Sequence, residues 1–359
     1  MVEPPKEFVE LTRSYVCIKI TDMRDHDLAN MGFDYGLTFF MILAHPEGRI
    51  YHRYSGRDGA DPLSWLSVGS LQRTMERTLE EHREYVRSGG NGRPDKILPR
   101  KTIFDIPTFA KEWKRRKKQP ECIQCHMVHS AIRDQLAAEN RLRKDMIFMY
   151  PPPSKIGLRM DPIEQDLVQN VEKGSIAAKA GLREGDRLRQ VGDTRILTIA
   201  DIQWALQQAP RRRTRLGIRF LRGDRLSSGG LLLEKDWQVG TSKDVAWRPW
   251  KWGLGPKPGF GGVAIDAEEK ATHDIPAGDF AFRITYLVTW GPDAYTGKNA
   301  QRAGLRKGDI VVSVAGKRDF GSVADFQAWF RLTQKPGTKI QVQVRRNRKL
   351  IPLRLPVLE

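Results

Sequence analysis

Two cysteines and a histidine stand together near the middle of the chain, in the run Cys122-Ile123-Gln124-Cys125-His126. Thiols at this spacing can add to the two vinyl groups of a porphyrin, and the histidine beside the second thiol can then ligate the iron. The pattern therefore predicts a covalently attached c-type haem held by Cys122, Cys125 and His126. The chain has only three cysteines, so two of them at this spacing before a histidine argue against chance.

Several methionines downstream can supply a sixth ligand to the iron. A helix is predicted over residues 131–143, and Met146 follows it directly, which makes it the favoured candidate over Met149 and Met160. His129 is close in sequence, but we expect it on the wrong face of the helix.

Two other uses of the motif stay open. The thiols of Cys122 and Cys125 can cycle as a redox dithiol, which would make the chain a thiol-disulfide enzyme. Alternatively, the pair can bind zinc together with His126 or His129, although the chain has no second cysteine pair to complete a usual structural zinc site.

The second half of the chain contains an internal repeat. Residues 177–193 (AAKAGLREGDRLRQVGD) align with residues 300–316 (AQRAGLRKGDIVVSVAG), and after one inserted residue TIADIQ at 198–203 aligns with SVADFQ at 322–327. In each copy we expect a short helix ended by a left-handed glycine, a Gly-Asp turn into an alternating strand, and a helix with Thr198 or Ser322 as its N-cap. This self-match indicates two copies of one module.

This order, with the pattern S-x-A-x-x-A-G-L-x-x-G-D, resembles the PDZ domains of bacterial trypsin-like proteases over residues 154–236 and, more loosely, over residues 250–358. In such domains a loop offers backbone amides to the C-terminal carboxylate of a peptide, which adds as a strand beside the helix of the module. The resemblance implies protein C-termini or peptides as partners.

The resemblance also implies which residues form each groove. In the first copy the carboxylate loop would be Ile156-Gly157-Leu158, with Ile202 and Leu206 along the groove; in the second it would be Gly261-Gly262-Val263, with Phe326 and Phe330 on the helix. The alternative is that these apolar side chains belong to the cores of the modules. Residues 264–299 read as an insertion at the second groove, which is therefore expected to bind less well.

No protease is expected beside these modules. A trypsin-like unit needs about two hundred residues that bring His, Asp and Ser together. The run Ser227-Ser228-Gly229-Gly230 is similar to a nucleophile loop, but it falls inside the first copy, and we predict a hairpin turn there.

The amino-terminal part predicts a strand over residues 14–20, a second over 39–44, a Pro46-Glu47-Gly48 turn, a third strand over 49–54 and a helix over 62–86 with Leu66, Leu71, Met75 and Leu79 on one side. This order resembles the latter part of a thioredoxin-like fold. Phe39 stands where that family keeps a cis-proline, and no C-x-x-C precedes the first strand. Cys17 is expected to be a small buried residue rather than a nucleophile.

The length and composition of the chain are those expected of several small domains with hydrophobic cores. The chain has 359 residues, 40% of them hydrophobic, and a net charge of +18. The basic clusters (114–118, 211–213 and 345–349) lie in different modules without interleaved aromatic residues, so nucleic acid is a disfavoured partner. No apolar run approaches the length of a membrane span. A segment rich in tryptophan and proline, residues 237–262, is expected to be a rigid connector packed on the second module.

Residues 1–5 contain no apolar stretch of the kind that marks a signal peptide, yet haem attachment and PDZ modules of this type belong outside the bacterial cytoplasm. We therefore expect a periplasmic or otherwise exported protein whose natural start lies upstream.

Together these patterns predict a multidomain α+β protein. Its expected parts are a truncated thioredoxin-like α/β domain (1–88), a linker with a short helical haem segment (89–153), and two PDZ-like, partly open β-barrels (154–236 and, after the connector, 237–359). The expected function is peptide docking combined with electron transfer or redox sensing, with an unknown redox partner.

Overall fold

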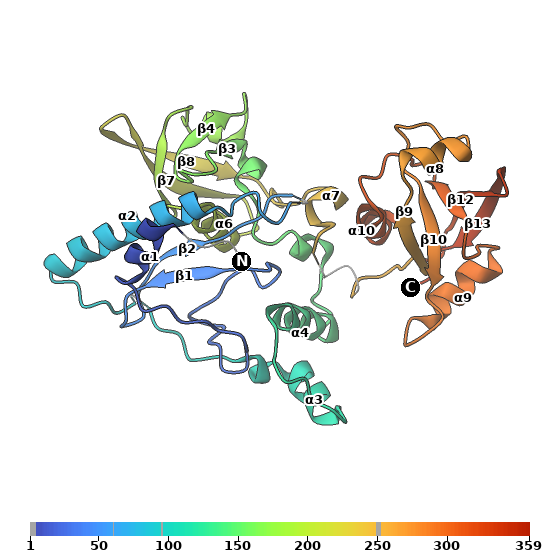
Figure 1. Cartoon of the computed structure of the whole chain (residues 1–359), viewed down its shortest axis with the longest axis horizontal. Coiled ribbons are helices and arrows are strands. Elements are labelled where there is room, and N and C mark those ends of the chain that lie inside the picture. Colours follow the sequence, from blue (N-terminus) through green and yellow to red (C-terminus); the bar gives the residue numbers. More distant parts are fainter. Residues whose placement is uncertain (1–4, 60, 95, 249–252) are drawn as a thin grey trace. The chain divides into compact units, whose positions relative to one another are not determined.

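The computed structural model describes residues 5–59, 61–94, 96–248 and 253–359. The chain divides into two compact units, Met1–Val239 and Gly240–Glu359, which run from blue to yellow and from yellow to red in Figure 1. Within the described ranges, no helix is both long and apolar enough to cross a bilayer. Trp250 and Trp252 of the expected connector lie outside these ranges. Trp237 packs on the core of the first module rather than on the second.

The amino-terminal part of the first unit is a hairpin with two helices. It contains α1 (Lys6–Thr12), β1 (Met41–Ala44), β2 (Ile50–Tyr54) and α2 (Val68–Arg87). The antiparallel strands turn at residues 46–48, where Gly48 has a φ of +98°. The Oγ of Ser67 caps α2 by accepting a hydrogen bond from the N–H of Ser70, and Leu43, Tyr54 and Met75 form the core between hairpin and helix.

The strand expected over residues 14–20 is not formed. In the described part of the chain β1 and β2 pair only with each other, so this segment has no neighbour to complete its backbone hydrogen bonds. Val16 and Ile18 are 89% and 81% exposed. Cys17, expected to be buried, is exposed as well.

The middle of the first unit is a small helical cluster. It comprises η1 (Ile103–Asp105), α3 (Pro107–Arg115), α4 (Cys125–Ala138) and η2 (Lys144–Ile147). The rings of Phe109 and Trp113 stack with centroids 5.5 Å apart, and Ile123 and Val128 are fully buried beside them. The helix begins at Cys125 instead of residue 131 because its first turn already contributes to this core.

The rest of the first unit is the first copy of the repeat. Its elements are η3 (Pro153–Ile156), β3 (Leu158–Met160), β4 (Val168–Val171), α5 (Ile176–Lys179), β5 (Arg187–Val191), β6 (Thr194–Arg195), α6 (Ile199–Gln208), β7 (Thr214–Arg222) and β8 (Arg225–Leu233). The strands form a β3-β4 pair and a sheet of order β6-β5-β7-β8. The turn expected at residues 227–230 is wrong: these residues lie inside β8, and the chain turns between Arg222 and Arg225.

The second unit repeats most of this order. It contains α7 (Ser242–Val245), β9 (Phe260–Ala264), α8 (Ala267–Thr272), β10 (Phe282–Leu287), α9 (Ala294–Arg302), β11 (Ile310–Val314), α10 (Val323–Thr333), β12 (Lys339–Arg346) and β13 (Lys349–Pro356). Its described strands form one sheet of order β13-β12-β11-β10-β9. The span expected to be an insertion, 264–299, thus holds strand β10 and most of α9, and the added element is α8.

One set of contacts recurs in both copies. Asp186 accepts hydrogen bonds from the N–H of Arg183 and from the guanidinium of Arg222, which also donates 2.7 Å to the carbonyl of Gly181. In the second copy Asp309 is held in the same way by the N–H of Arg306 and by Arg346, and Arg346 donates 2.7 Å to Gly304. The buried aspartate of each Gly-Asp turn thereby joins the helix end to the sheet.

Candidate functional site

The edge of β3 and helix α6 border the candidate groove of the first copy. Gly157 follows η3 with a φ of +79°, and a Cβ at this position would lie 2.2 Å from Cβ of Ser175, so only glycine fits. The carbonyl of Gly157 accepts from the N–H of Glu172 at 2.9 Å. Because backbone groups alternate along a strand, the N–H and C=O of Leu158 point to the opposite edge of β3. No described strand pairs with that edge.

The residues expected along this groove are buried in the core of the module. Ile156, Leu158, Ile202 and Leu206 are at most 3% exposed and belong to one apolar cluster. The structure brings them together, but as core residues, which is the alternative interpretation of their apolar character.

Helix α6 begins with a capping box that serves two purposes. The Oγ of Thr198 accepts from the N–H of Asp201 at 3.1 Å, while the Asp201 carboxylate accepts from the N–H of Thr198. The same carboxylate accepts from the N–H of Arg53 in β2 at 2.9 Å, and the Thr198 hydroxyl donates to the carbonyl of Arg53. The start of α6 is therefore fastened to the amino-terminal hairpin.

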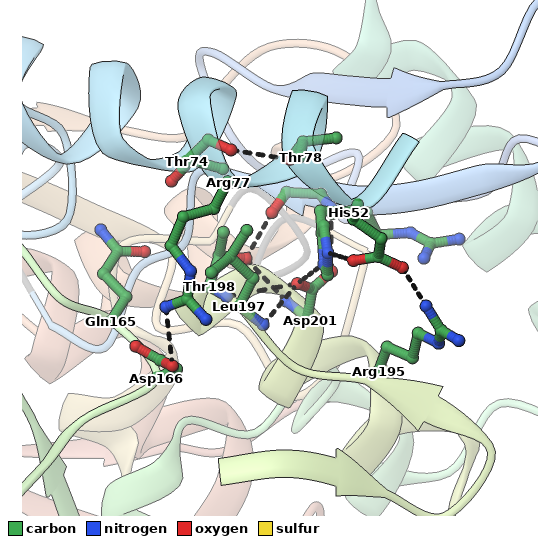
Figure 2. A network of polar contacts seen from close by, with 12 residues as sticks. His52, Thr74, Arg77, Thr78, Gln165, Asp166, Arg195, Leu197, Thr198 and Asp201 are labelled. Atoms are coloured by element: carbon green, nitrogen blue, oxygen red, sulfur yellow. Dashed lines mark hydrogen bonds and ion pairs between the residues drawn. The ribbon is translucent and has the colours of Figure 1, made fainter. Parts of the chain in front are cut away.

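His52 lies at the centre of this junction (Figure 2), between α2 and α6. Its Nδ1 is 2.8 Å from Oδ2 of Asp201, and its Nε2 is 2.9 Å from Oε2 of Glu81, which also pairs with Arg195. A carboxylate only accepts hydrogen bonds, so both ring nitrogens must carry a proton. Burial by itself would lower the pKa of His52, but the charge and hydrogen bonds of Asp201 and Glu81 raise it to about 9.

A second ionic cluster joins α2 to the strands of the module. The buried carboxylate of Asp166 accepts from Arg77 of α2 at 2.9 Å, as Figure 2 shows, and from Arg187 and Arg189 of β5 at 3.1 and 2.9 Å. These contacts add to the His52 junction, so the hairpin, α2 and the module form one packed body.

The loop between β2 and α2 lies along α6. Residues 55–59 and 61–65 are called the cover segment below. A Cβ at Gly56, whose φ is +132°, would lie 2.3 Å from Cγ2 of Ile199 and 2.7 Å from Oε1 of Gln203. The side-chain amide of Gln203 donates 3.0 Å to the carbonyl of Arg57. Trp65, only 8% exposed, belongs to the apolar cluster of the module.

The covered face of α6 contacts the chain segments before and after β3. Ile199, Gln203 and Gln207 follow one another at a spacing of four residues and so share one face. Tyr150 precedes η3. Its carbonyl accepts a hydrogen bond from the side-chain amide of Gln203 at 3.1 Å, and its N–H donates to the side-chain oxygen of Gln207 at 2.7 Å. At the other end of β3, Gln165 accepts from the N–H of Ile199 at 3.1 Å and donates to the carbonyl of Trp65 at 3.0 Å.

Sequence reasoning missed this junction. Two signals point to it in retrospect. The strand Ile50–Tyr54 lacks the polar-apolar alternation of a half-exposed strand, and all but the first of its residues are buried. In α6, Asp201 and Gln203 interrupt an otherwise apolar sequence, and a polar side chain that is buried must find partners.

The corresponding site in the second unit is arranged differently. Gly261, Gly262 and Val263 lie inside strand β9 instead of forming a loop, and Val263 is 63% exposed. The side-chain amide of Gln327 donates 2.7 Å to the carbonyl of Phe260. Phe326 and Phe330 are fully buried in the core of this unit.

The cysteine motif lies at the start of α4. Cys122 and His126 are exposed and Cys125 is half-buried, while Ile123 points into the helical cluster. Cys122 lies before the first turn of α4, whereas Cys125 begins that turn and packs partly against the helical cluster. Both thiols are free. Burial raises the pKa of Cys125, which disfavours a reactive thiolate at that position.

The other residues considered as iron or zinc ligands lie in different parts of the first unit. Met160 is 1% exposed, with its side chain packed in the core of the first module. His129 is buried in the helical cluster, and Met146 lies half-buried in η2. Over the described residues no three His, Cys, Asp or Glu side chains are grouped as a metal site, so the zinc interpretation gains no support.

Comparison with known proteins identifies one domain. No curated protein matches the chain. Among solved structures, a photosystem II D1 C-terminal processing protease aligns at 18% identity with a TM-score of 0.19, covering 46% of this chain and 44% of that one. The chain thus spans less than half of that protein, and the similarity is too low to carry an argument. Residues 167–219 match the PDZ domain family, and the chain therefore contains a PDZ domain, a module that binds proteins or peptides.

Proposed function

We propose that this protein docks the carboxyl-terminal segment of a partner protein in the groove between β3 and α6. The observation that carries the proposal is the edge of β3, where Leu158 directs its N–H and C=O away from β4 beside a helix of a PDZ domain. An extended peptide can add to such an edge through backbone hydrogen bonds. The terminal carboxylate of the peptide would lie near the start of β3, beside the loop around Gly157.

A titration of the full chain tests this proposal. Peptides that end in a free, apolar residue should bind weakly, and amidation of the same peptides should weaken binding by about tenfold or more because charge-assisted hydrogen bonds are lost. Hydrogen exchange should show new protection at β3. Equal binding of free and amidated peptides, or protection that appears elsewhere, would place the partner outside this groove.

We also propose that the second unit is a divergent PDZ module. The shared element order and the paired contacts of Asp186 and Asp309 support this assignment. In this unit the bond from Gln327 to Phe260 holds the helix against the corresponding strand. Peptide binding there is expected to be weaker than in the first module.

A second candidate function rests on the cysteine motif. Free thiols at Cys122 and Cys125, followed by the exposed imidazole of His126, are the groups that covalent attachment of a haem by two thioether bonds requires, with the imidazole as an iron ligand. The group would supply one-electron exchange. Ile123 and Val128, on the opposite side, hold this turn in place through the aromatic cluster.

Haem attachment is tested by export from a host that matures c-type cytochromes. The protein should then give a pyridine haemochrome spectrum, and the double variant Cys122→Ala/Cys125→Ala should lose it. Met146→Ala should change the spectrum if this residue is the sixth ligand. A colourless wild-type protein from that host would contradict haem attachment and favour a redox dithiol formed by Cys122 and Cys125.

We further propose an exported location and a thioredoxin-like origin for the amino-terminal part. The hairpin β1-β2 followed by α2 has the element order expected from that family. Secretion assays with a fused reporter test the location.

A further inference from the structure

The cover segment contacts α6, the helix beside the proposed peptide groove. We propose that the cover segment occupies the groove in cis, so that a partner peptide reaches β3 only after this segment leaves α6. This inference rests on the proposed function, because it concerns the regulation of the same groove.

Contacts with the first half of α6 support the proposal. At the start of the helix Gly56 contacts Ile199, and in the middle the carbonyl of Arg57 accepts from Gln203. The carbonyl of Trp65 accepts from Gln165, which lies between β3 and β4. Two of these three contacts use backbone carbonyls, as a bound peptide would. Helix α6 is consequently buried on nearly every side, and between Ile199 and Leu206 only Trp204 is partly exposed.

The segment is anchored at both ends and held by replaceable contacts between them. One anchor is the junction of His52 and Arg53 with Asp201, reinforced by the Arg53 guanidinium, which lies 3.9 Å from the ring of Trp204. The other is Trp65 in the apolar cluster of the module. A tethered segment competes with a free peptide at a high effective concentration. The affinity of a free peptide is therefore reduced by the fraction of molecules in which the groove is covered.

Two glycines in the segment provide a matched pair of variants. In Gly56→Ala the new methyl group would collide with Ile199 and Gln203 at a backbone conformation that alanine rarely adopts, so the segment should be displaced. In Gly59→Ala the methyl group meets nothing within 4 Å, so the segment should stay in place. Thermal unfolding of both variants establishes that each is folded before binding is measured.

The test combines hydrogen exchange with fluorescence anisotropy on the full chain, with a labelled apolar peptide that has a free carboxyl terminus. In Gly56→Ala we expect faster exchange in residues 53–65 and along α6, together with about tenfold tighter peptide binding. Gly59→Ala should match the wild type in both. In the wild type, saturating peptide should itself increase exchange in residues 55–65.

The outcomes separate this inference from the proposed function. Faster exchange in Gly56→Ala without peptide binding supports the covered groove and contradicts peptide docking. Equal affinities of wild type and Gly56→Ala, despite faster exchange in the variant, would overturn cis competition. Peptide binding that leaves residues 55–65 as protected as before would also overturn it. If Gly56→Ala does not fold, the wild-type exchange experiment with and without peptide decides the question.

Discussion

The stability of the first unit should fall as the pH rises through the range in which His52 loses its proton. In the folded chain both ring nitrogens of this residue face carboxylates, and the pKa is raised to about 9. In the unfolded chain an ordinary histidine pKa of about 6.5 applies. A group whose pKa is raised on folding contributes its full stabilisation below the unfolded value and loses it as the pH passes the folded value. The window is therefore about pH 6.5 to 9.

The magnitude follows from the size of this shift. A difference of about 2.5 units at 1.36 kcal/mol per unit corresponds to roughly 3 kcal/mol of unfolding free energy. His52 is 2% exposed, so solvent screens the pair only weakly. This free energy is the combined effect of two carboxylates, Asp201 and Glu81, that both interact with one imidazolium.

Urea unfolding at a series of pH values from about 6 to 9.5 measures this effect. His52→Gln is the matched control, because glutamine preserves most of the volume but cannot take up a proton. The difference in unfolding free energy between wild type and His52→Gln should be largest near pH 6 and shrink by roughly 3 kcal/mol towards pH 9.5. Parallel profiles for the two proteins would refute the assignment of a protonated, doubly paired His52.

Four further substitutions probe features of the two units. Asp186→Asn and Asp309→Asn should each destabilise their own unit by a similar amount, roughly 1.5–3 kcal/mol, because each weakens the same set of charged hydrogen bonds; unequal losses in denaturation of the two units would contradict the equivalence. Met160→Ala should cost about 2–5 kcal/mol in thermal or urea unfolding, as expected for a buried side chain, and should leave any haem spectrum unchanged. Cys17→Ser should change stability by less than about 0.5 kcal/mol because the thiol is exposed; a larger loss in the same assay would indicate that the residue is buried.

Local patterns predicted the elements of the repeat well. Strands 187–191 and 310–314 and the N-caps Thr198 and Ser322 are found where sequence reasoning placed them. Each of these features depends on contacts within a few residues, such as a capping oxygen or an alternating strand. They can therefore be read without knowledge of the rest of the chain.

The failures concern contacts between distant segments. The run at residues 14–20 has the composition of a strand, yet a strand forms only where a neighbour supplies the other half of its hydrogen bonds. The groove residues Ile202 and Leu206 have the same apolar character whether they line a groove or fill a core. The contact of His52 with Asp201 joins positions 149 residues apart, and no local pattern predicts such a pair.

The contacts that Asp186 and Asp309 make have a mechanical consequence. Asp186 is tied to Arg222, 36 residues further along the chain, and Asp309 to Arg346, 37 residues further. Each tie closes a loop of nearly the same length inside its own unit. In both units the tie lies beside the backbone pairing of the same two strands, Arg187 with Leu221 and Ile310 with Arg345. Under tension each tie and the strand pair next to it must therefore open together, at equivalent points of the two units.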